Sequence, residues 1–256
     1  MKNLTKNLPE GVYPYVDLTS ETVTAKNGYK ELIYTPGNDV ILTSRREYFD
    51  SILVDGKEVL TSGSGRLIVD TLVNPVVKIR FKYWITKFTN CFRYCENLIS
   101  IPEDLFSDNL GIVNLADCFE ECTSLTSIPE GLFRYNPEVL NFYYCFKSCT
   151  SLTSIPKDLF RYNTKVTDFA GCFKMCYDLT SIPGDLFSYN TRVYNITDCF
   201  YGCSKLKTMP IDSDGTPIYN RSTPGKSGYS TVGYYGDCFY RCDSIEGYSE
   251  IPSGWK

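Results

Sequence analysis

Residues 145–156 read Cys-Phe-Lys-Ser-Cys-Thr-Ser-Leu-Thr-Ser-Ile-Pro, and close copies of this stretch recur along the chain. Its two cysteines are spaced Cys-x-x-x-Cys, and all 12 cysteines of the 256-residue chain fall into such pairs. The pairs are Cys91/Cys95, Cys118/Cys122, Cys145/Cys149, Cys172/Cys176, Cys199/Cys203 and Cys238/Cys242. The first five pairs begin 27 residues apart, and the sixth begins 39 residues after the fifth. A fixed spacing of this length is typical of proteins built from stacked repeats.

Each copy predicts three local structures. The β-prone residues Leu-Thr-Ser-Ile at 152–155 stop at Pro156, which predicts one short strand per repeat. The next residues, Pro-x-x-Leu-Phe-x-x-Asn, predict a single helical turn that Asn163 leaves in a left-handed conformation. The Cys-Phe-x-x-Cys segment predicts a short helix, because residues at i and i+4 share one helical face. Together these elements predict an α/β solenoid of 27-residue coils with stacked parallel strands.

Residues 1–81 lack the 27-residue period and predict a small all-β, sandwich-like domain. Its predicted strands are 12–18, 31–34, 40–43, 51–54, 58–60, 67–72 and 76–83. We expect this domain to cap the first coil, whose apolar end would otherwise face water. The solenoid is predicted for residues 82–256, with an insertion at about 212–235 and a degenerate C-terminal cap repeat.

The composition argues against several functional classes. The net charge of −4 provides no electrostatic footprint for nucleic acid. No apolar run approaches the length of about 18 residues that a membrane span requires, and the opening residues Met1–Pro9 show no secretory signal. The chain contains no histidine, which excludes Ser-His and Cys-His catalysis and histidine-ligated zinc. Phosphate-binding glycine loops and nucleophile elbows are also absent from the sequence. We therefore expect no enzymatic activity and no cofactor.

The cysteines have three interpretations. The favoured one is a column of buried, reduced thiols, because free cysteine behaves as a small hydrophobic residue. Some disulfides are the second interpretation, although parallel stacked side chains meet poorly for the dihedral angle that a disulfide requires. A thiolate metal site is the third and least favoured, because no pair differs from the repetitive ones. Asp212-Ser213-Asp214-Gly215 superficially resembles a calcium loop but lacks the remaining ligand positions, so we predict a polar turn there.

The pattern Cys-Phe-x-x-Cys-x-x-Leu-Thr-Ser-Ile-Pro resembles the BspA-type leucine-rich repeats of bacterial surface proteins. The resemblance covers about residues 82–252, roughly two thirds of the chain. It implies a leucine-rich-repeat solenoid located at the cell surface. It also implies adhesion to proteins or to host surfaces.

Tyrosines supply the candidate ligand-binding residues. The insertion is rich in Tyr, Gly, Ser and Thr, a mixture that binding surfaces use at low entropic cost. Tyrosines also recur at variable repeat positions, where exposed rings suit contacts with protein or sugar. The alternative is that the insertion only closes the last coil and that the rings shield the coil edges. The candidate binding residues are Tyr162, Tyr189, Tyr219, Arg221, Tyr229, Tyr234 and Tyr235.

These observations predict a non-enzymatic binding or adhesion protein that presents its repeat surface to a protein or glycan. Neither nucleic acid nor a membrane span is expected, and oligomers are compatible with the sequence. The alternative is a structural assembly component, such as a phage virion or fibre protein built from the same repeat. The chain would then belong to a virion particle rather than to a cell surface.

Overall fold

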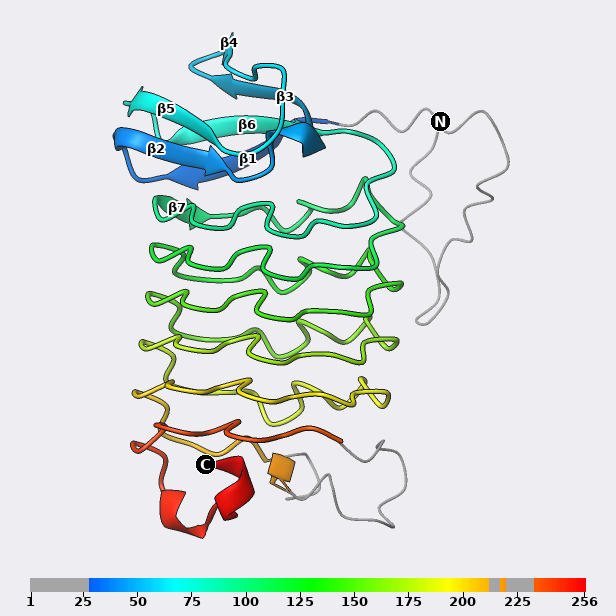
Figure 1. Cartoon of the computed structure of the whole chain (residues 1–256), viewed down its shortest axis with the longest axis vertical. Helices are drawn as coiled ribbons and strands as arrows, with labels where there is room; N and C mark the ends of the chain where they lie inside the picture. The colour runs from blue at the N-terminus through cyan, green and yellow to red at the C-terminus, as the bar shows by residue number, and fades with distance from the viewer. Residues whose placement is uncertain (1–27, 212–216, 220–232) are drawn as a thin grey trace.

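The computed structural model describes residues 28–211, 217–219 and 233–256. A β-sheet domain lies at one end of a stack of coils (Figure 1). Parallel backbone bridges connect successive coils through the column Lys87, Asn114, Asn141, Asp168, Asn195 and Tyr234. Neighbours in this column are 27 residues apart, except for the last pair, which spans the insertion. The coils therefore stack with the period of the cysteine pairs.

The Cys-Phe-x-x-Cys segments form the most regular hydrogen-bonded side of the stack. Every second backbone N–H of one coil donates to a carbonyl of the next, at 2.7–2.9 Å in the third coil. The donor and acceptor pairs there are Phe142/Asp168, Tyr144/Ala170, Phe146/Cys172 and Ser148/Lys174. The residue before each cysteine has a positive φ, 53° at Tyr144 and 58° at Ser148. These left-handed residues reverse the local turn, so that the segment zigzags instead of coiling into a helix.

The predicted α/β class is therefore wrong. The part of the chain that the structure describes contains β-strands, bridges and short 3-10 turns but no α-helix. The predicted helix fails at the left-handed residues, which interrupt helical hydrogen bonding twice in each copy. The Leu-x-Ser-Ile segment forms a named strand only in the first coil, β7 (Leu98–Ser100), and later coils show a single bridge, Ser154 with Ser181.

The asparagine that ends each Pro-x-x-Leu-Phe-x-x-Asn turn also differs from expectation. Asn163 is not among the residues with positive φ. Its side chain is fully buried, and its Nδ2 donates to the carbonyls of Phe133 at 3.1 Å and Asn136 at 2.8 Å in the preceding coil. Asn136 and Asn190 repeat this arrangement. This residue therefore joins neighbouring coils rather than ending a helical turn.

The β domain consists of two antiparallel sheets. The larger sheet has the strand order β4-β3-β6-β1-β7, and the smaller pairs β2 with β5. The strands are β1 (Lys30–Tyr34), β2 (Gly37–Thr43), β3 (Phe49–Val54), β4 (Lys57–Glu58), β5 (Leu67–Leu72) and β6 (Val76–Phe81). They coincide closely with the predicted segments, except that the predicted strand at 12–18 lies outside the described residues. Alternation of apolar and polar residues between turns was sufficient to locate them.

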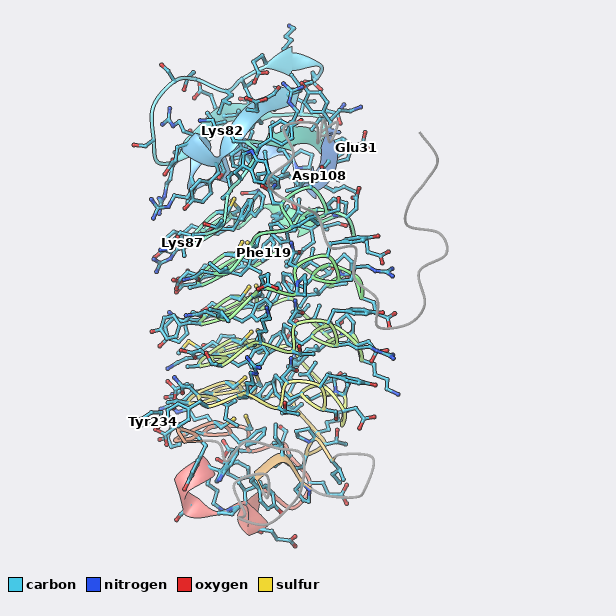
Figure 2. All side chains as sticks on the ribbon, turned by 90° about the vertical axis from the view of Figure 1, so that its right-hand side faces the viewer. Glu31, Lys82, Lys87, Asp108, Phe119 and Tyr234 are labelled. Atoms are coloured by element: carbon cyan, nitrogen blue, oxygen red, sulfur yellow. The ribbon has the colours of Figure 1, made fainter. Side chains whose placement is uncertain are left out.

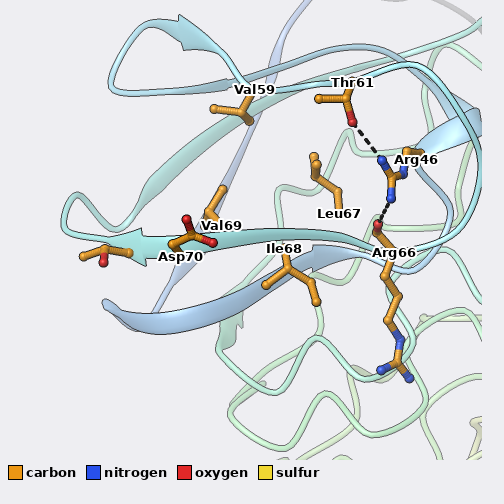
Figure 3. Close-up of a pocket in the computed structure, with 9 residues that line it drawn as sticks. Arg46, Val59, Thr61, Arg66, Leu67, Ile68, Val69 and Asp70 are labelled. Carbon is orange, nitrogen blue, oxygen red and sulfur yellow. Dashed lines mark hydrogen bonds between the residues drawn. The ribbon is translucent and has the colours of Figure 1, made fainter.

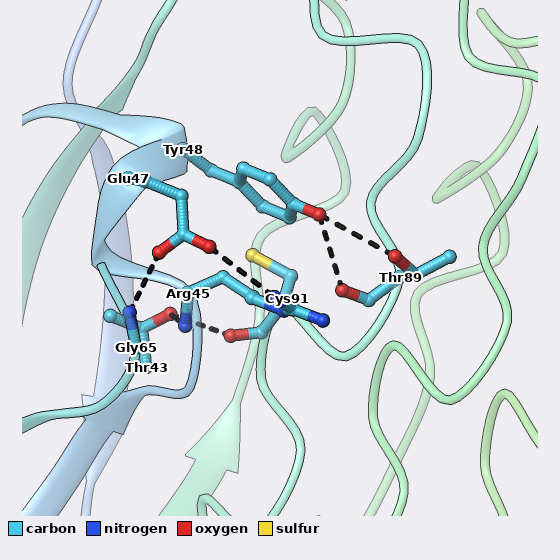
Figure 4. A network of polar contacts seen from close by, with 7 residues as sticks. All are labelled: Thr43, Arg45, Glu47, Tyr48, Gly65, Thr89 and Cys91. Atoms are coloured by element: carbon cyan, nitrogen blue, oxygen red, sulfur yellow. Dashed lines mark hydrogen bonds and ion pairs between the residues drawn. The ribbon is translucent and has the colours of Figure 1, made fainter.

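Hydrogen bonds join the β domain to the first coil (Figure 4). The carbonyl of Cys91 accepts from the Ser44 N–H at 3.0 Å and from the Thr43 hydroxyl at 2.6 Å, and the Tyr48 hydroxyl lies 3.4 Å from that of Thr89. In the second coil the equivalent carbonyl, that of Cys118, accepts an N–H from the coil above. The β domain thus occupies acceptors that a preceding coil would otherwise fill. Strand β7 of the first coil also pairs with β1, which makes one continuous core.

The other end of the stack is closed by two 3-10 turns, η3 (Tyr248–Glu250) and η4 (Ser253–Trp255). Trp255 is buried and stacks on the Tyr235 ring, with centroids 4.7 Å apart. Its carbonyl accepts the Phe239 N–H at 2.7 Å. The last coil therefore does not end in an open apolar surface.

Repeated aromatic columns fill the interior of the stack. The Phe of each Cys-Phe-x-x-Cys segment stacks on its neighbours with centroid distances of 5.3–5.7 Å. A second column, from the Leu-Phe positions, has spacings of 6.0–6.1 Å. Burial of each such ring contributes roughly 1.5–3 kcal/mol, and a coil obtains this burial only between neighbours.

Candidate binding face

Seven tyrosines lie on the outward positions of the Cys-Phe-x-x-Cys side, which we call the tyrosine face. In the third coil, Phe142, Cys145 and Phe146 are buried, whereas Tyr143 is exposed and Tyr144 is half-buried. Equivalent segments in the other coils place their side chains in the same columns, and Figure 2 shows Lys87 and Tyr234 along one edge of the stack. The tyrosines of this face are Tyr94, Tyr143, Tyr144, Tyr194, Tyr201, Tyr234 and Tyr240.

Six of these rings are arranged in pairs. Tyr194 and Tyr234, exposed by 50% and 57%, meet edge to face with centroids 5.1 Å apart. The Tyr201 and Tyr240 rings lie 5.2 Å apart, and those of Tyr143 and Tyr144 stack at 4.0 Å. Paired rings on hydrogen-bonded coils lose little further freedom when a partner binds.

Two glycines make room for rings of this face. A Cβ on Gly171 would lie 2.1 Å from the Tyr144 ring, and one on Gly233 would lie 2.2 Å from the Tyr194 ring. Each glycine belongs to the coil that follows its tyrosine. The rings therefore lie against the backbone of the neighbouring coil, which holds them close to the plane of the face.

Several charged groups on the tyrosine face are paired with one another. Glu120 is 1% exposed and lies between Arg93 and Lys147, each 2.6 Å from one of its carboxylate oxygens. Burial, together with the charge of Glu120, raises the pKa of Asp117 to about 6. This network holds the cations Arg93 and Lys147 against the buried carboxylate of Glu120.

Cations also lie over several of the rings. The Lys147 ammonium is 4.6 Å from the Tyr144 ring centroid, and the Lys174 ammonium is 4.2 Å from that of Tyr201. Lys174 also forms an ion pair with Asp198 at 2.7 Å. Such contacts hold a cation and a ring in one orientation at modest energetic gain.

Among the described residues of the insertion that were predicted to bind, Tyr219 and Tyr235 both pack on Trp255, whereas Tyr234 lies apart from them. Tyr234 belongs to the tyrosine face, but Tyr235 is half-buried under Trp255 and serves the terminal packing. Tyr219 is half-buried with its ring 6.5 Å from Trp255. Arg221 and Tyr229 lie outside the described residues.

Tyr162 and Tyr189 lie on another side of the coils. They belong to the column that includes Asp108, which Figure 2 places away from the edge of Lys87 and Tyr234. Tyr162 lines a cavity of about 190 Å³ together with Arg134 and the acidic residues Glu103, Glu130 and Asp158. The exposed Tyr189 ring lies 5.1 Å from the Arg161 guanidinium. The five predicted residues that the structure describes are therefore divided between separate surfaces.

Six tyrosines of this face were not among the predicted binding residues: Tyr94, Tyr143, Tyr144, Tyr194, Tyr201 and Tyr240. Tyr94 and Tyr240 occupy the variable positions inside a Cys-Phe-x-x-Cys segment, for which the sequence predicts a helix. They lie in neighbouring columns, three and two residues after the first cysteine of their pairs, between the buried Phe and the buried second Cys.

The thiols of these segments are chemically protected. All 12 cysteines are free and buried, and burial raises the pKa of each thiol above its ordinary value. The second cysteine of a pair donates to the carbonyl of the phenylalanine one coil earlier, as Cys149 does to Phe119 at 3.2 Å. A thiol that is protonated and enclosed in this way is a poor nucleophile.

Two further observations concern the described part of the chain. Its cysteine, aspartate and glutamate side chains form no group of three or more that could hold a metal ion. No helix within the same residues is long and apolar enough to cross a membrane.

Comparison with known proteins adds no family: no protein-family model matches the chain, and no curated protein matches it. The similarity to BspA-type repeats stays a prediction.

Proposed function

We propose that the protein is a non-enzymatic binding protein that contacts a protein or glycan partner through its tyrosine face. The observation that carries this proposal is the presence of four exposed rings on one hydrogen-bonded side of the stack. These rings are Tyr143, Tyr194, Tyr234 and Tyr240, exposed by between 36% and 57%. Tyrosine combines a large apolar ring with a polar hydroxyl, and it is enriched where proteins bind partners.

The surroundings of the rings favour binding by a preformed surface. The backbone beneath them is held by inter-coil hydrogen bonds of 2.7–3.1 Å, from Phe88 in the first coil to Gly202 in the fifth. The charges of Glu120 and Asp198 are already matched by cations of this face. A partner would therefore meet ordered rings and would not need to reorganise the chain, which lowers the entropic cost of association.

The experiment is a protein and glycan array probed with the wild-type chain, followed by affinity measurements with ring variants. The double variant Tyr194→Ala/Tyr234→Ala removes the most exposed ring pair. We expect it to weaken binding by roughly 10- to 30-fold, because central aromatic residues at interfaces contribute about 2 kcal/mol. The matched control is Tyr189→Ala, which removes a ring of 44% exposure on another side of the coils.

The outcomes separate the two tyrosine surfaces. Retained affinity in Tyr189→Ala, together with weakened affinity in the double variant, would support binding through the tyrosine face. Loss of affinity in Tyr189→Ala with full affinity in the double variant would assign binding to the column of Tyr162 and Tyr189. A wild-type chain that binds no component of either array would contradict the proposed function.

A further inference from the structure

A small cavity opens on the side of the coils that carries Tyr162, and we call it the Gly131 pocket. Its volume is about 190 Å³, smaller than the sites of about 300–1,000 Å³ that hold drug-sized ligands. Three consecutive coils supply its lining: Glu103 from the first, Glu130, Gly131 and Arg134 from the second, and Asp158 and Tyr162 from the third. Hydrogen bonds from buried asparagines join these coils, from Asn136 Nδ2 to the Asn109 carbonyl at 3.0 Å and from Asn163 Nδ2 to the Asn136 carbonyl at 2.8 Å. The pocket is therefore preformed and has room for one small group.

Gly131 shapes the pocket because it lacks a side chain. The equivalent positions of neighbouring coils are Asp104, Asp158 and Asp185, so the glycine leaves a notch in a column of aspartates. The Glu103 carboxylate enters this notch, and a Cβ on Gly131 would collide with its Oε1. Gly131 is not among the glycines with positive φ, so the backbone does not require a glycine there. The glycine instead makes room for the Glu103 side chain.

The charged side chains of the pocket are held apart from one another. Among the described residues, the carboxylates of Glu103 and Glu130 take part in no hydrogen bond or ion pair, and neither does the Arg134 guanidinium. A guanidinium and a carboxylate form strong paired hydrogen bonds where they meet. Arg134 lies instead over the rings of Tyr135 and Tyr162, 5.4 Å and 5.9 Å from their centroids. The pocket therefore presents acceptors and donors that the protein itself does not use.

A second groove, along β5 in the β domain, differs in this respect (Figure 3). It is larger, with a volume of about 620 Å³. The Arg46 guanidinium of that groove donates to the Thr61 hydroxyl at 2.7 Å and to the Arg66 carbonyl. Its cation is thus bonded to the protein, whereas Arg134 keeps its N–H groups for a ligand.

The groups of the Gly131 pocket select the chemistry of that ligand. Carboxylates only accept hydrogen bonds and a guanidinium only donates them, so the ligand must carry donors and acceptors side by side. An organic cation would meet the charge of Arg134, and an organic anion would meet three carboxylates. A metal ion does not fit, because the acidic groups of the described residues form no cluster that could hold one. A neutral molecule with neighbouring hydroxyls satisfies both requirements, since each hydroxyl both donates and accepts.

We propose that the Gly131 pocket binds one neutral monosaccharide unit, either free or at the end of a glycan. Two hydroxyls of the sugar donate to the carboxylates of Glu103 and Glu130, and a hydroxyl oxygen accepts from the Arg134 guanidinium. The Tyr162 ring supplies an apolar wall on which the C–H groups of a sugar ring pack. The pocket lies on a different side of the coils from the tyrosine face, so this second site goes beyond binding through that face.

NMR titration of the isotope-labelled chain tests the proposal. The probes are glucose, galactose, mannose and N-acetylglucosamine, each as the free sugar and as its methyl glycoside. Because a ligand with so few atoms binds with a Kd on the order of 1 mM, each probe is added to about 50 mM. At least one should shift the amides of Gly131 and Asp158 and the Arg134 Nε–H signal, without shifting the amides of Tyr194 and Tyr234. A methyl glycoside that binds as well as its free sugar supports the end of a glycan as the ligand, and binding of the free sugar alone supports a free monosaccharide.

Two variants remove different parts of the pocket. Gly131→Ala forces the Glu103 carboxylate out of the notch without changing any charge, and Arg134→Met removes the donor at an exposed position. Each should weaken sugar binding by roughly 10-fold, the effect of losing a hydrogen bond to a charged group. Arg134→Met keeps the test valid if Gly131→Ala does not fold. The matched control is Gly111→Ala, because Gly111 also lacks a positive φ and a Cβ there would meet only the Thr86 side chain, at 3.8 Å. This control should bind the sugar with wild-type affinity.

Two results would overturn the proposal. The first is a wild-type chain in which none of the sugars shifts the amides near Gly131. If the organic cation methylguanidinium shifted them instead, the pocket would be assigned to a basic side chain of a protein partner. The second is wild-type affinity in Arg134→Met. Tyr194→Ala/Tyr234→Ala should bind the sugar as the wild type does, and a loss of sugar binding there would assign the sugar to the tyrosine face, so failure of one proposal is distinguishable from failure of the other.

Discussion

The two long sides of each coil are held together differently. On the Cys-Phe side, residues 142–149 donate every second N–H to the next coil at 2.7–2.9 Å. On the Thr-Ser side, residues 152–155 contribute one bridge, Ser154 with Ser181, and a longer bond from the Thr180 N–H to the Thr153 carbonyl at 3.2 Å. β-propensity alone favours the Thr-Ser side. The ladder instead follows the buried columns of Phe and Cys, so packing decides where the coils pair.

The largest expected effect is alkaline unfolding, because every thiol lies on the Cys-Phe side. Burial raises the pKa of the native thiols, whereas unfolded thiols titrate near about 8.5. Below that pH the thiols are protonated in both the folded and the unfolded chain, so they do not lower the free energy of unfolding. Above it only the unfolded chain releases protons, which lowers the free energy of unfolding by about 1.4 kcal/mol per pH unit for each ionised thiol. With 12 thiols, we expect the fold to be lost within roughly one to two pH units above about 8.5.

Circular dichroism as a function of pH measures this transition, and a thiol-specific reagent follows exposure of the cysteines. The native protein at neutral pH should not react, and the denatured, unreduced protein should show close to 12 free thiols. The double variant Cys145→Ala/Cys149→Ala should have a shallower pH dependence. Unchanged stability between about pH 8 and pH 10, or rapid reaction of the folded protein, would contradict the buried-thiol arrangement.

A core substitution on each side gives the next largest difference. Phe146 is fully buried and stacks on Phe119 at 5.3 Å and on Phe173 at 5.6 Å. Phe146→Ala should lower the free energy of unfolding by about 3–5 kcal/mol, since it removes a ring from the interior. Thr153→Ala on the exposed Thr-Ser side should change it by no more than about 0.5 kcal/mol. Urea unfolding of the two variants measures both values, and equal losses would remove the distinction between the sides.

Glycine substitutions should have small effects of opposite sign. Ser148 has a φ of 58°, which a side chain disfavours by about 1–2 kcal/mol. Ser148→Gly should therefore raise the free energy of unfolding by up to about 1 kcal/mol. Thr153 is not among the residues with positive φ, and Thr153→Gly should lower it by about 0.5–1 kcal/mol. Denaturation midpoints measure the signs, and destabilisation by both changes would exclude relief of left-handed strain.

The 27-residue period was enough to locate the coils, and the alternation of apolar and polar residues was enough to locate the strands between residues 30 and 81. Both signals depend on where apolar side chains recur. The α/β class was wrong because i, i+4 spacing does not distinguish a helix from two successive left-handed reversals. One signal was present: the residue before the first cysteine of each pair is Asn, Asp or Gly in five copies, namely Asn90, Asp117, Gly171, Asp198 and Asp237. These residue types tolerate positive φ best.

The candidate site was predictable only in part. Tyr234 was identified because exposed tyrosines were sought in the insertion and at variable repeat positions. Tyr235 has the same composition signal but lies under Trp255, a contact that depends on how the chain end folds back. Tyr162 and Tyr189 were grouped with the insertion because their side of the coil depends on the path of the whole repeat. Residue type thus indicated candidates, and geometry separated them.

Hydrogen exchange tests the central claim most directly, namely that the Cys-Phe ladder holds the coils together. The amides of Tyr144, Phe146 and Ser148 should exchange among the slowest in the protein, at rates set by global unfolding. The amides of residues 152–155 and 179–182 on the Thr-Ser side should exchange faster, through local opening. Faster exchange at residues 142–149 than at residues 152–155 would contradict the account.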